Sequence, residues 1–578
     1  MPQQEYRVVI YQMMTRLFGN NVLNNTPWGT IEENGVGKFS DITQIALKIL
    51  KEQGYTHIWY TGIIEHALLT DYTRYGIELD DADIVKGRAG SPYAIKDYYD
   101  VNPDLANHVP DRIAEFEQLI HRSHKAGLNV VIDFIPNHVA RNYYSDAKPT
   151  DALDFGTNDQ TDRFEANNNF YYLPQTSFIV PKDYQLSENH SFPTKNGFFK
   201  ESPAKASGNN IFVHNPAIND WFETIKLNYG IDFQNEATKH FDPIPDTWIK
   251  MRDILLYWAN KGVDGFRCDM AEMVPVEFWD WVIGEVKKKY PNQLFIAEIY
   301  NPNVYREYIF SGGFDYLYDK VELYDTLKHI IQGKATTDEL TTIWQKQEGI
   351  GSHMLRFLEN HDEQRIASPH FAGNARKGIP MMAATAFMHN GPIMMYFGQD
   401  VGEPAHGNSG FSNDNGRTTI FDYWGVPEHI KWMSDGAFNG KQLSTDQKQL
   451  QTQYQEILLA CHQYKALRIG GFYDLHFFNR NEQYQGYSNQ VYTFLRHSDD
   501  QSILIAINFS DKEETSKIKI PPDAWDKLNI NSDRVIVGTT ILSKSSTLTY
   551  GGDSELVLTL PALNYVIVPI KKYQNENN

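Results

Sequence analysis

The stretch Gly265-Phe266-Arg267-Cys268-Asp269 is a short, mostly apolar run that ends in an acid and carries an arginine two residues before it. Residues two apart on a β-strand point to the same side of the sheet, so the guanidinium of Arg267 is expected beside the carboxylate of Asp269. A permanent cation there favours the ionised form of the acid, which could then act as a nucleophile. The alternative is a structural ion pair, which predicts no further acids facing it.

Three other apolar runs end in a similar way, with acidic or imidazole side chains. They are Asp133-Phe134-Ile135-Pro136-Asn137-His138, Phe295-Ile296-Ala297-Glu298 and Phe357-Leu358-Glu359-Asn360-His361-Asp362. A single acid after an apolar run is more often a helix N-cap than a catalytic group. Four such runs favour a site, because the functional groups of a parallel βα barrel lie at the carboxyl ends of its strands. Glu298 follows three apolar residues, and such surroundings raise the pKa of a carboxyl group and keep it protonated.

The four runs belong to a longer alternation of β-like and helical segments between residue 6 and about residue 432, which is typical of βα units around a parallel sheet. Eight runs fit a barrel, at residues 8–11, 57–60, 130–134, 265–269, 294–298, 314–318, 354–358 and 393–397. Helices are expected between them at residues 41–52, 112–125, 247–261, 275–289 and 381–389. The sequence therefore predicts an α/β fold.

Two regions depart from this alternation. Residues 140–241 are rich in Asn, Asp, Ser and aromatic residues, and predict a small inserted domain whose aromatics form its own core or part of a sugar-binding wall. After a helix at 445–464, apolar alternation at residues 491–495, 503–508, 534–537, 555–560 and 565–570 predicts a C-terminal antiparallel β-sandwich. We divide the chain into a barrel (1–139 and 242–468), an insertion (140–241) and a C-terminal domain (469–578).

Composition excludes several classes of partner. The net charge of −20 repels nucleic acid and anionic lipid, and no run of eighteen apolar residues could span a membrane. The two cysteines, Cys268 and Cys461, build neither a disulfide framework nor a cysteine zinc site. The run at 8–11 leaves no room for a signal peptide, so we expect either a cytoplasmic protein or an exported one whose signal has been removed. The oligomeric state is left open, with a monomer as the expectation.

The four strand-end segments, in this order, resemble the signature regions of glycoside hydrolase family 13, the α-amylase family. The resemblance implies a TIM (β/α)8 barrel with a B domain inserted after the third strand and a C-terminal antiparallel β-sandwich domain. It implies that Asp269 is the nucleophile, that Glu298 is the general acid/base, and that Asp362 is a third carboxylate that binds the hydroxyl groups of the distorted sugar. Further residues match substrate-binding positions of the family pattern: His138, Arg267, His361 and, in Gly90-Ser91-Pro92-Tyr93, the stacking tyrosine Tyr93.

The implied activity is that of a retaining, endo-acting α-glucan hydrolase that cleaves α-1,4-glucosidic bonds of starch-like polysaccharides and maltooligosaccharides, with its two main carboxyl groups about 5 Å apart. Sister activities stay open: an α-glucosidase, a neopullulanase-like enzyme or a transglycosylase. From another class, an inactive glucan-binding protein is possible but disfavoured by the intact acids. A phosphate-binding βα enzyme is disfavoured because the sequence has no glycine-rich phosphate loop. Glu272 and Met273 stand where many starch-cleaving members carry a Lys-His pair that contacts the leaving-group side, which leaves the preference for the sugars at subsites +1 and +2 open.

The implied chemistry needs no cofactor, but the resemblance raises the possibility of structural calcium at two places. Asn137 matches a calcium ligand, although residues 226–228 read Lys-Leu-Asn where relatives carry Asp-Leu-Asn. An ammonium group at Lys226 could replace the ion electrostatically. Asn24 and Asn25 lie in an oxygen-rich stretch that resembles a calcium loop, or forms a metal-free turn.

Overall fold

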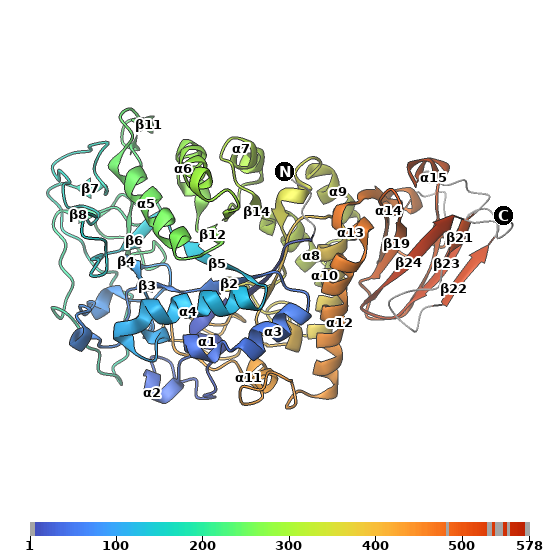
Figure 1. Ribbon diagram of the computed structural model, residues 1–578, viewed down its shortest axis with the longest axis horizontal. Helices are drawn as coiled ribbons and strands as arrows, with labels where there is room; N and C mark the ends of the chain where they lie inside the picture. Colours follow the sequence, from blue (N-terminus) through green and yellow to red (C-terminus); the bar gives the residue numbers. More distant parts are fainter. Residues whose placement is uncertain (1–5, 481–484, 529–534, 538–546, 552–554, 573–578) are drawn as a thin grey trace.

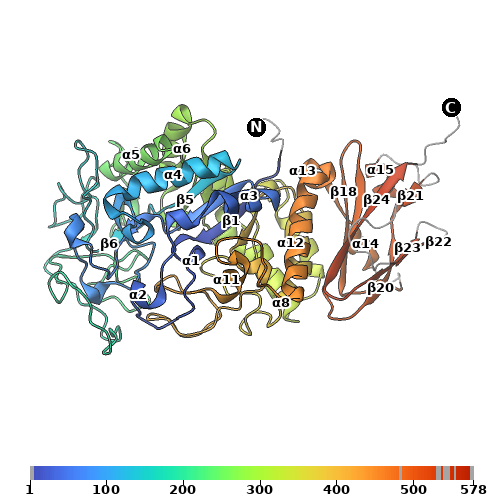
Figure 2. The ribbon, with the colours of Figure 1, turned by 60° about the horizontal axis from the view of Figure 1, so that its bottom comes forward.

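The computed structural model describes residues 6–480, 485–528, 535–537, 547–551 and 555–572. In Figure 1 the barrel and its insertion form the larger body, and the C-terminal β-domain lies beside it beyond the long helix α12 (Thr445–Gln463). Figure 2 shows the same arrangement after rotation, with α12 between the barrel and the β-domain.

Eight parallel strands form the predicted barrel. In spatial order they are β15 (Met354–Leu355), β14 (Tyr316–Tyr318), β13 (Leu294–Ala297), β12 (Gly265–Cys268), β5 (Asn129–Phe134), β2 (His57–Thr61), β1 (Val9–Met14) and β16 (Ile393–Tyr396). An isolated parallel bridge between Arg356 and Ile393 links the two ends. Strands such as β1 and β12 are buried along their whole length, which explains why the apolar runs were readable in the sequence.

All eight expected strands are present, but five are shorter than predicted, and of these β12, β13 and β16 each end one residue early. β14 begins at Tyr316 rather than at residue 314, and β15 ends at Leu355 rather than at residue 358. Beyond Leu355 only Arg356 continues the pairing, through its backbone bonds to Pro392 and Met394. The following residues leave the sheet, so the polar end of this run lies on a loop at the carboxyl edge of the barrel.

Helices surround the barrel between its strands (Figure 1). The longer ones are α3 (Gln44–Glu52), α4 (Arg112–Lys125), α5 (Asp246–Asn260), α6 (Val276–Lys289), α9 (Asp338–Lys346) and α10 (Gly378–Phe387); shorter ones are α7 (Tyr305–Phe310), α8 (Asp325–Ile331) and α11 (Pro427–Met433). The predicted bounds 112–125 are confirmed, whereas α10 begins three residues earlier than predicted because its proline lies in the first turn, where its missing N–H does no harm. Over the described ranges, none of the helices has the length and apolarity needed to cross a bilayer.

Two excursions on the carboxyl side of the barrel bear on the site. The first follows β2 and contains the antiparallel hairpin of β3 (Ile64–His66) and β4 (Ile95–Val101). The second is the insertion, which starts at β6 (His138–Ala140) and returns through β9 (Thr224–Lys226). Its remaining strands have two residues each: β7 (Tyr172–Leu173), β8 (Ala204–Lys205), β10 (Ile231–Asp232) and β11 (Thr238–Lys239). A separate apolar cluster is shared by the insertion, which contributes Phe178, Tyr184 and Phe222 among others, and the β3–β4 excursion, which contributes Ile84 and Val85 among others.

The C-terminal domain is the predicted antiparallel sandwich. One sheet contains β17 (Gly471–Asp474), β18 (Val491–His497), β19 (Ser502–Asn508), β24 (Asn564–Lys572) and β21 (Val535–Val537); the other contains β20 (Glu514–Lys519), β23 (Glu555–Leu560) and β22 (Thr547–Gly551). The predicted strand at 534–537 is confirmed from Val535 onward, and Arg534 lies outside the described residues. Alternate residues of β19 face opposite sides, and both faces are buried.

Candidate active site

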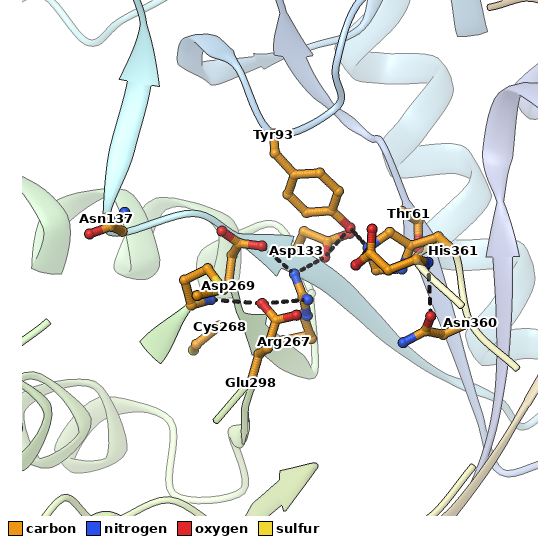
Figure 3. Close-up of polar contacts among 12 residues, drawn as sticks. Thr61, Tyr93, Asp133, Asn137, Arg267, Cys268, Asp269, Glu298, Asn360 and His361 are labelled. Atoms are coloured by element: carbon orange, nitrogen blue, oxygen red, sulfur yellow. Dashed lines mark hydrogen bonds and ion pairs between the residues drawn. The ribbon is translucent and has the colours of Figure 1, made fainter. Parts of the chain in front are cut away.

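The four strand-end segments converge at the carboxyl edge of the barrel, as the sequence predicts. Figure 3 shows Arg267, on β12, at the centre of this edge, with Asp133 from β5, Asp269 directly after β12, and Glu298 directly after β13 around it. The segment after β15 supplies the imidazole of His361 from the opposite side.

Arg267 binds three carboxylates at once. Its Nη1 lies 2.7 Å from Oδ1 of Asp269, and its Nη2 lies 2.8 Å from Oε2 of Glu298. A weaker contact of 3.3 Å joins Nη1 to Oδ1 of Asp133. The guanidinium is fully buried, so these ion pairs are little screened by solvent. The alternative of an isolated structural Arg267–Asp269 pair is therefore wrong, because it predicted no further acids at this place.

Glu298 is held by two additional donors. The backbone N–H of Met270 donates to Oε2 over 2.8 Å, and the hydroxyl of Tyr300 donates to Oε1 over 2.7 Å. Met270 has a φ of 42°, an unfavourable left-handed conformation for a non-glycine residue. This turn directs its N–H toward Glu298, so local backbone strain coincides with orientation of the acid.

Tyr93, His361 and Asp362 form a second connected group. The Tyr93 hydroxyl lies 2.5 Å from Nε2 of His361, and the two rings stack with centroids 5.1 Å apart. Nε2 of His361 also lies 2.9 Å from Oδ2 of Asp362. Gln12, from β1, fixes the other side of the imidazole through a 2.8 Å contact with Nδ1. Asp362 keeps 42% of its side chain exposed, so its carboxylate faces open space rather than the protein core.

The surroundings of the three carboxyl groups shift their pKa values in different directions. Burial, reinforced by Asp269 and Asp362 against the opposing effect of Arg267, raises the pKa of Glu298 to about 7, which confirms the expectation for this residue. The pKa of Asp269 is also raised, because its burial outweighs the ion pair with Arg267. Arg267 lowers the pKa of Asp269, as the strand spacing led us to expect, but the spacing carries no information on desolvation, which acts in the other direction. For Asp362, burial is outweighed by His361 and the arginines, and the pKa falls to about 2.

A cavity of about 350 Å³ contains these carboxylates. Its lining comprises Lys86, Ser91, Tyr93, His138, Trp221, Glu223, Thr224, Asp269, Met270, Glu298, Tyr300, Asp362, Ile420 and Phe421. The walls therefore come from the β3–β4 excursion, the insertion and the segment after β16, whereas the barrel supplies the acids at the floor. Lys86 and Glu223, both buried, form a 2.7 Å ion pair between the first two of these walls.

The predicted substrate-binding residues take part in this cavity in different ways. Tyr93 and His138 line it directly, and burial lowers the pKa of His138 to about 3, so its imidazole is neutral near pH 7. The His138 ring lies 5.3 Å from the ring of Trp221. Arg267 and His361 lie behind the lining and hold the acids in place.

The residues around Asn137 do not fit a calcium ion. Its amide oxygen accepts a hydrogen bond from the ammonium of Lys226, and its amide nitrogen donates to the carbonyl of Gly208 over 2.7 Å. Lys226 also donates to the carbonyl of Met273 over 3.0 Å. Burial lowers the pKa of Lys226 to about 7. The ammonium group of Lys226 thus already binds the amide oxygen of Asn137 that a calcium ion would need as a ligand.

Asn24 and Asn25 do not fit a metal either. Asn24 donates to the carbonyl of Glu33 and to the side chain of Asn34, and its own oxygen accepts from Thr26. Both amide atoms of Asn25 pair with the backbone of Gly425, at 2.6 and 3.0 Å. Asn25 therefore fixes the loop after β1 to the segment before α11, whereas Asn24 bonds within its own loop.

Several functional residues were missed by the sequence reasoning. Tyr300 stands two residues after Glu298, so the alternation of a strand end could have indicated that it shares the same side. Glu272 accepts from the backbone N–H groups of Tyr300 and Asn301, which makes it a brace for that loop rather than a group free to contact substrate. Lys86 and Glu223 lie 137 positions apart in irregular segments and gave no local signal.

Comparisons with known proteins agree with this fold. A family model described as "Alpha amylase, catalytic domain" matches residues 28–491. A second, described as "Alpha amylase, C-terminal all-beta domain", matches residues 484–571. Together the two matches cover residues 28–571, which include the insertion, nearly all of the sandwich and the barrel except β1.

Curated relatives are more distant and differ in activity. An alpha-1,4-glucan:maltose-1-phosphate maltosyltransferase of Cereibacter sphaeroides is 29% identical over 215 residues, which is 34% of this chain and 33% of that protein. Alpha-amylase 2 of Dictyoglomus thermophilum is 22% identical over 439 residues, which is 75% of this chain and 60% of that protein. The chain thus spans less than two thirds of the length of these relatives.

Solved structures agree on the fold. The α-amylase of Geobacillus thermoleovorans complexed with acarbose has a TM-score of 0.61 at 18% identity, covering 99% of this chain and 100% of that one. A maltogenic α-amylase of Thermotoga neapolitana has a TM-score of 0.59 at 17% identity. At such low identity the likeness concerns the fold alone.

Proposed function

The chain belongs to the α-amylase family of glycoside hydrolases, and from this premise we propose that it hydrolyses internal α-1,4-glucosidic bonds of starch-like glucans with retention of anomeric configuration. The family acts on α-glucans, so the finer proposal concerns the bond, the position in the chain and the stereochemistry. Three carboxylates at one cavity support it, because retaining glycosidases use a nucleophile and a general acid on opposite sides of the scissile bond.

In the proposed first step, Asp269 attacks the anomeric carbon while Glu298 transfers its proton to the glycosidic oxygen. A bond forms between Asp269 and the sugar, and the leaving chain departs with the proton. In the second step Glu298, now a base, removes a proton from water as the water oxygen displaces Asp269. Asp362 carries negative charge throughout and stabilises the positive charge that develops on the ring.

The observation that carries this proposal is the shared contact of Asp269 and Glu298 with Arg267. One guanidinium between the two groups places them close together and keeps their relative orientation fixed. A pKa of about 7 lets Glu298 hold a proton in an otherwise negative site, which suits a general acid. Asp362, whose pKa is about 2, is ionised under all ordinary conditions.

A second candidate is action on short chains or chain ends, with transfer to another sugar. The cavity of about 350 Å³ lies at the small end of the range of roughly 300–1,000 Å³ for ligand pockets. The Lys86–Glu223 ion pair, Trp221 and Phe421 wall it, which favours a short bound segment. An α-glucosidase, a neopullulanase-like enzyme and a transglycosylase all fit this second candidate.

Incubation with soluble starch, pullulan and maltotriose tests the proposal, with products resolved by size and by anomeric configuration. Mixed short maltooligosaccharides of α-configuration from starch are expected. Asp269→Asn should lower kcat by at least about a thousand-fold, because no covalent intermediate can form. Asp280→Asn, an exposed acid on α6, is the matched control and should keep full activity.

Other product patterns change the assignment in defined ways. Glucose alone, panose from pullulan, or products longer than the substrate would replace endo-hydrolysis with the second candidate while keeping the mechanism. Products of β-configuration would contradict retention. Binding of glucan without turnover by the wild-type protein would favour a glucan-binding protein.

A further inference from the structure

Four carboxylates meet beside the β3–β4 hairpin, away from the acids that line the cavity. They are Glu65 on β3, Asp97 and Asp100 on β4, and Asp146 at the start of the insertion. One carboxylate oxygen from each lies within 4.8 Å of those of the others. Glu65 and Asp97 are direct partners across the two antiparallel strands, a position in which like charges destabilise a hairpin.

Two members of this cluster already accept hydrogen bonds from the protein, which use part of the acceptor capacity of each carboxylate. Asp97 accepts from the backbone N–H of Tyr99 over 2.7 Å, from the hydroxyl of Ser145 over 2.6 Å and from the N–H of Ala147 over 3.0 Å. Asp100 accepts from Nε of Arg112 over 2.7 Å. Both carboxylates are therefore held in fixed positions with their charge supported.

Glu65 differs from both. It is only 2% exposed, and its Oε2 is a buried atom without a hydrogen-bond partner anywhere in the described ranges. A buried carboxylate oxygen left unpaired costs free energy that a native fold rarely tolerates. The described surroundings of Glu65 therefore lack a hydrogen-bond donor or a cation that could bind this oxygen.

The local charge is also unbalanced. Besides the four clustered acids, Asp80 lies nearby and binds Nζ of Lys96 over 3.2 Å. Three nearby cations act on these acids: Lys96, engaged with Asp80; Arg112, engaged with Asp100 and 3.7 Å from Asp146; and Lys148, which is close to Asp97 but engaged with Asp154. Five carboxylates therefore face three cations, one of which already binds Asp154, and an excess of negative charge remains around Glu65.

We propose that Glu65, Asp97, Asp100 and Asp146 bind a calcium ion. Carboxylate oxygens are the ligands that hard divalent cations prefer. Oxygens on opposite sides of a calcium ion lie about 4.6–5.2 Å apart, so separations within 4.8 Å are compatible with its shell. Four protein carboxylates at one place favour calcium over magnesium, because magnesium usually keeps several waters and binds only one or two carboxylates. Asp146 keeps 21% of its side chain exposed, which gives the ion a path from solvent.

Such an ion would join the hairpin to the insertion. β4 begins two residues after Tyr93, and Ser145 and Ala147 already bind Asp97. The ion would thus fix two segments that wall the active-site cavity. The competing explanation is a proton held on Glu65, because burial and the neighbouring acids raise its pKa. That explanation predicts no response to calcium.

Calcium binding by the full chain separates the two. The protein is stripped with a chelator, dialysed and titrated calorimetrically with calcium chloride, and its Tm is measured with and without calcium. One ion per chain should bind, and calcium at about 100 times its Kd should raise the Tm by roughly 2 °C. Glu65→Gln, which keeps the shape but removes the charge, should abolish both effects.

Further variants keep the test decisive. If Glu65→Gln does not fold, Asp146→Asn serves, since the one ion pair of its more exposed side chain among the described residues is the long contact with Arg112. This variant should weaken calcium binding at least about tenfold. Asp280→Asn should leave binding unchanged. No binding by the wild-type protein, or binding retained in both Glu65→Gln and Asp146→Asn, would overturn the proposal. Loss of binding in Asn24→Ala instead would assign the ion to the loop after β1 and overturn it too.

Discussion

Glu298 lies among groups that act on its pKa in opposite directions. Burial is the largest influence and raises the pKa, Arg267 lowers it, and Asp269 and Asp362 raise it again. The hydroxyl of Tyr300 donates to the carboxylate and so lowers the pKa as well. The result, about 7, leaves the protonated form abundant at neutral pH. Tyr300 therefore helps to set the pH above which Glu298 loses the proton that it needs as general acid.

The pH profile of kcat/KM tests this control. The general acid must carry its proton in the free enzyme, so kcat/KM should fall tenfold per pH unit above about pH 7. Tyr300→Phe removes a hydrogen bond to the charged form, so the pKa of Glu298 should rise and the alkaline limb should move to higher pH.

Tyr305→Phe is the matched control for this prediction. Tyr305, on α7, has a buried hydroxyl without a hydrogen-bond partner in the part of the chain that is described, so its loss removes no contact with the site. Its profile should coincide with that of the wild type. A limb that stays in place in Tyr300→Phe, or moves to lower pH, would show that the tyrosine does not act through Glu298.

At the scale of elements, the ion pair of Lys86 and Glu223 joins the β3–β4 excursion to the insertion. Their side chains are 6% and 5% exposed, so the charges are almost completely desolvated. Lys86 also lies over the ring of Phe411, 4.8 Å from its centroid, which adds a third segment to the contact. A single buried pair thus holds together loops that contribute opposite walls of the cavity.

A double-mutant cycle measures this link. Lys86→Met should destabilise the protein by about 3–5 kcal/mol, because it leaves the Glu223 charge buried and unpaired. Adding Glu223→Gln should recover most of that loss, since no uncompensated charge then remains. Chemical denaturation gives the free energies, and Lys48→Met, whose lysine is 74% exposed, is the control with little effect. Additive losses in the double variant would mean that the pair is not coupled.

The strands and their terminal acids could be predicted because each depends on local sequence. Runs such as that of β12 are apolar throughout, since both faces of a barrel strand are buried, and Asp269 and Glu298 follow such runs directly. What could not be predicted depends on segments far apart in the chain. The raised pKa of Asp269 comes from burial by the whole site, and Glu65 meets Asp146 only because the insertion folds back over the hairpin.

At the scale of the whole molecule, the two faces of the five-stranded sheet of the C-terminal domain pack into two different hydrophobic cores. Ile503, Ile505 and Ile507 of β19 belong to the same apolar cluster as the barrel and its helices. The alternate residues Leu504 and Ala506 belong to the core between the two sheets of the sandwich. The β-domain is therefore packed against the barrel as a layer of a common core, beyond α12 in Figure 2.

Two contacts show how this shared layer is fixed. Arg496, which is 1% exposed on β18, donates from Nη1 to the carbonyl of Phe387 at the end of α10 over 2.8 Å. The ring of Phe387 meets that of Tyr565, on β24, with centroids 5.5 Å apart. Because an apolar face of β19 would be exposed by separation, the barrel and sandwich should lose their structure together.

Scanning calorimetry should therefore show one unfolding transition for the full chain. Phe387→Ala removes a fully buried ring from the shared core and should cost about 3–5 kcal/mol, moving that whole transition to lower temperature. Phe477→Ala, in α14 (Leu475–Asn479), is the matched control, because its ring is 70% exposed and should contribute little. Two separated transitions, of which Phe387→Ala moves only one, would mean that the sandwich unfolds independently and that its contact with α10 transmits no stability to the barrel.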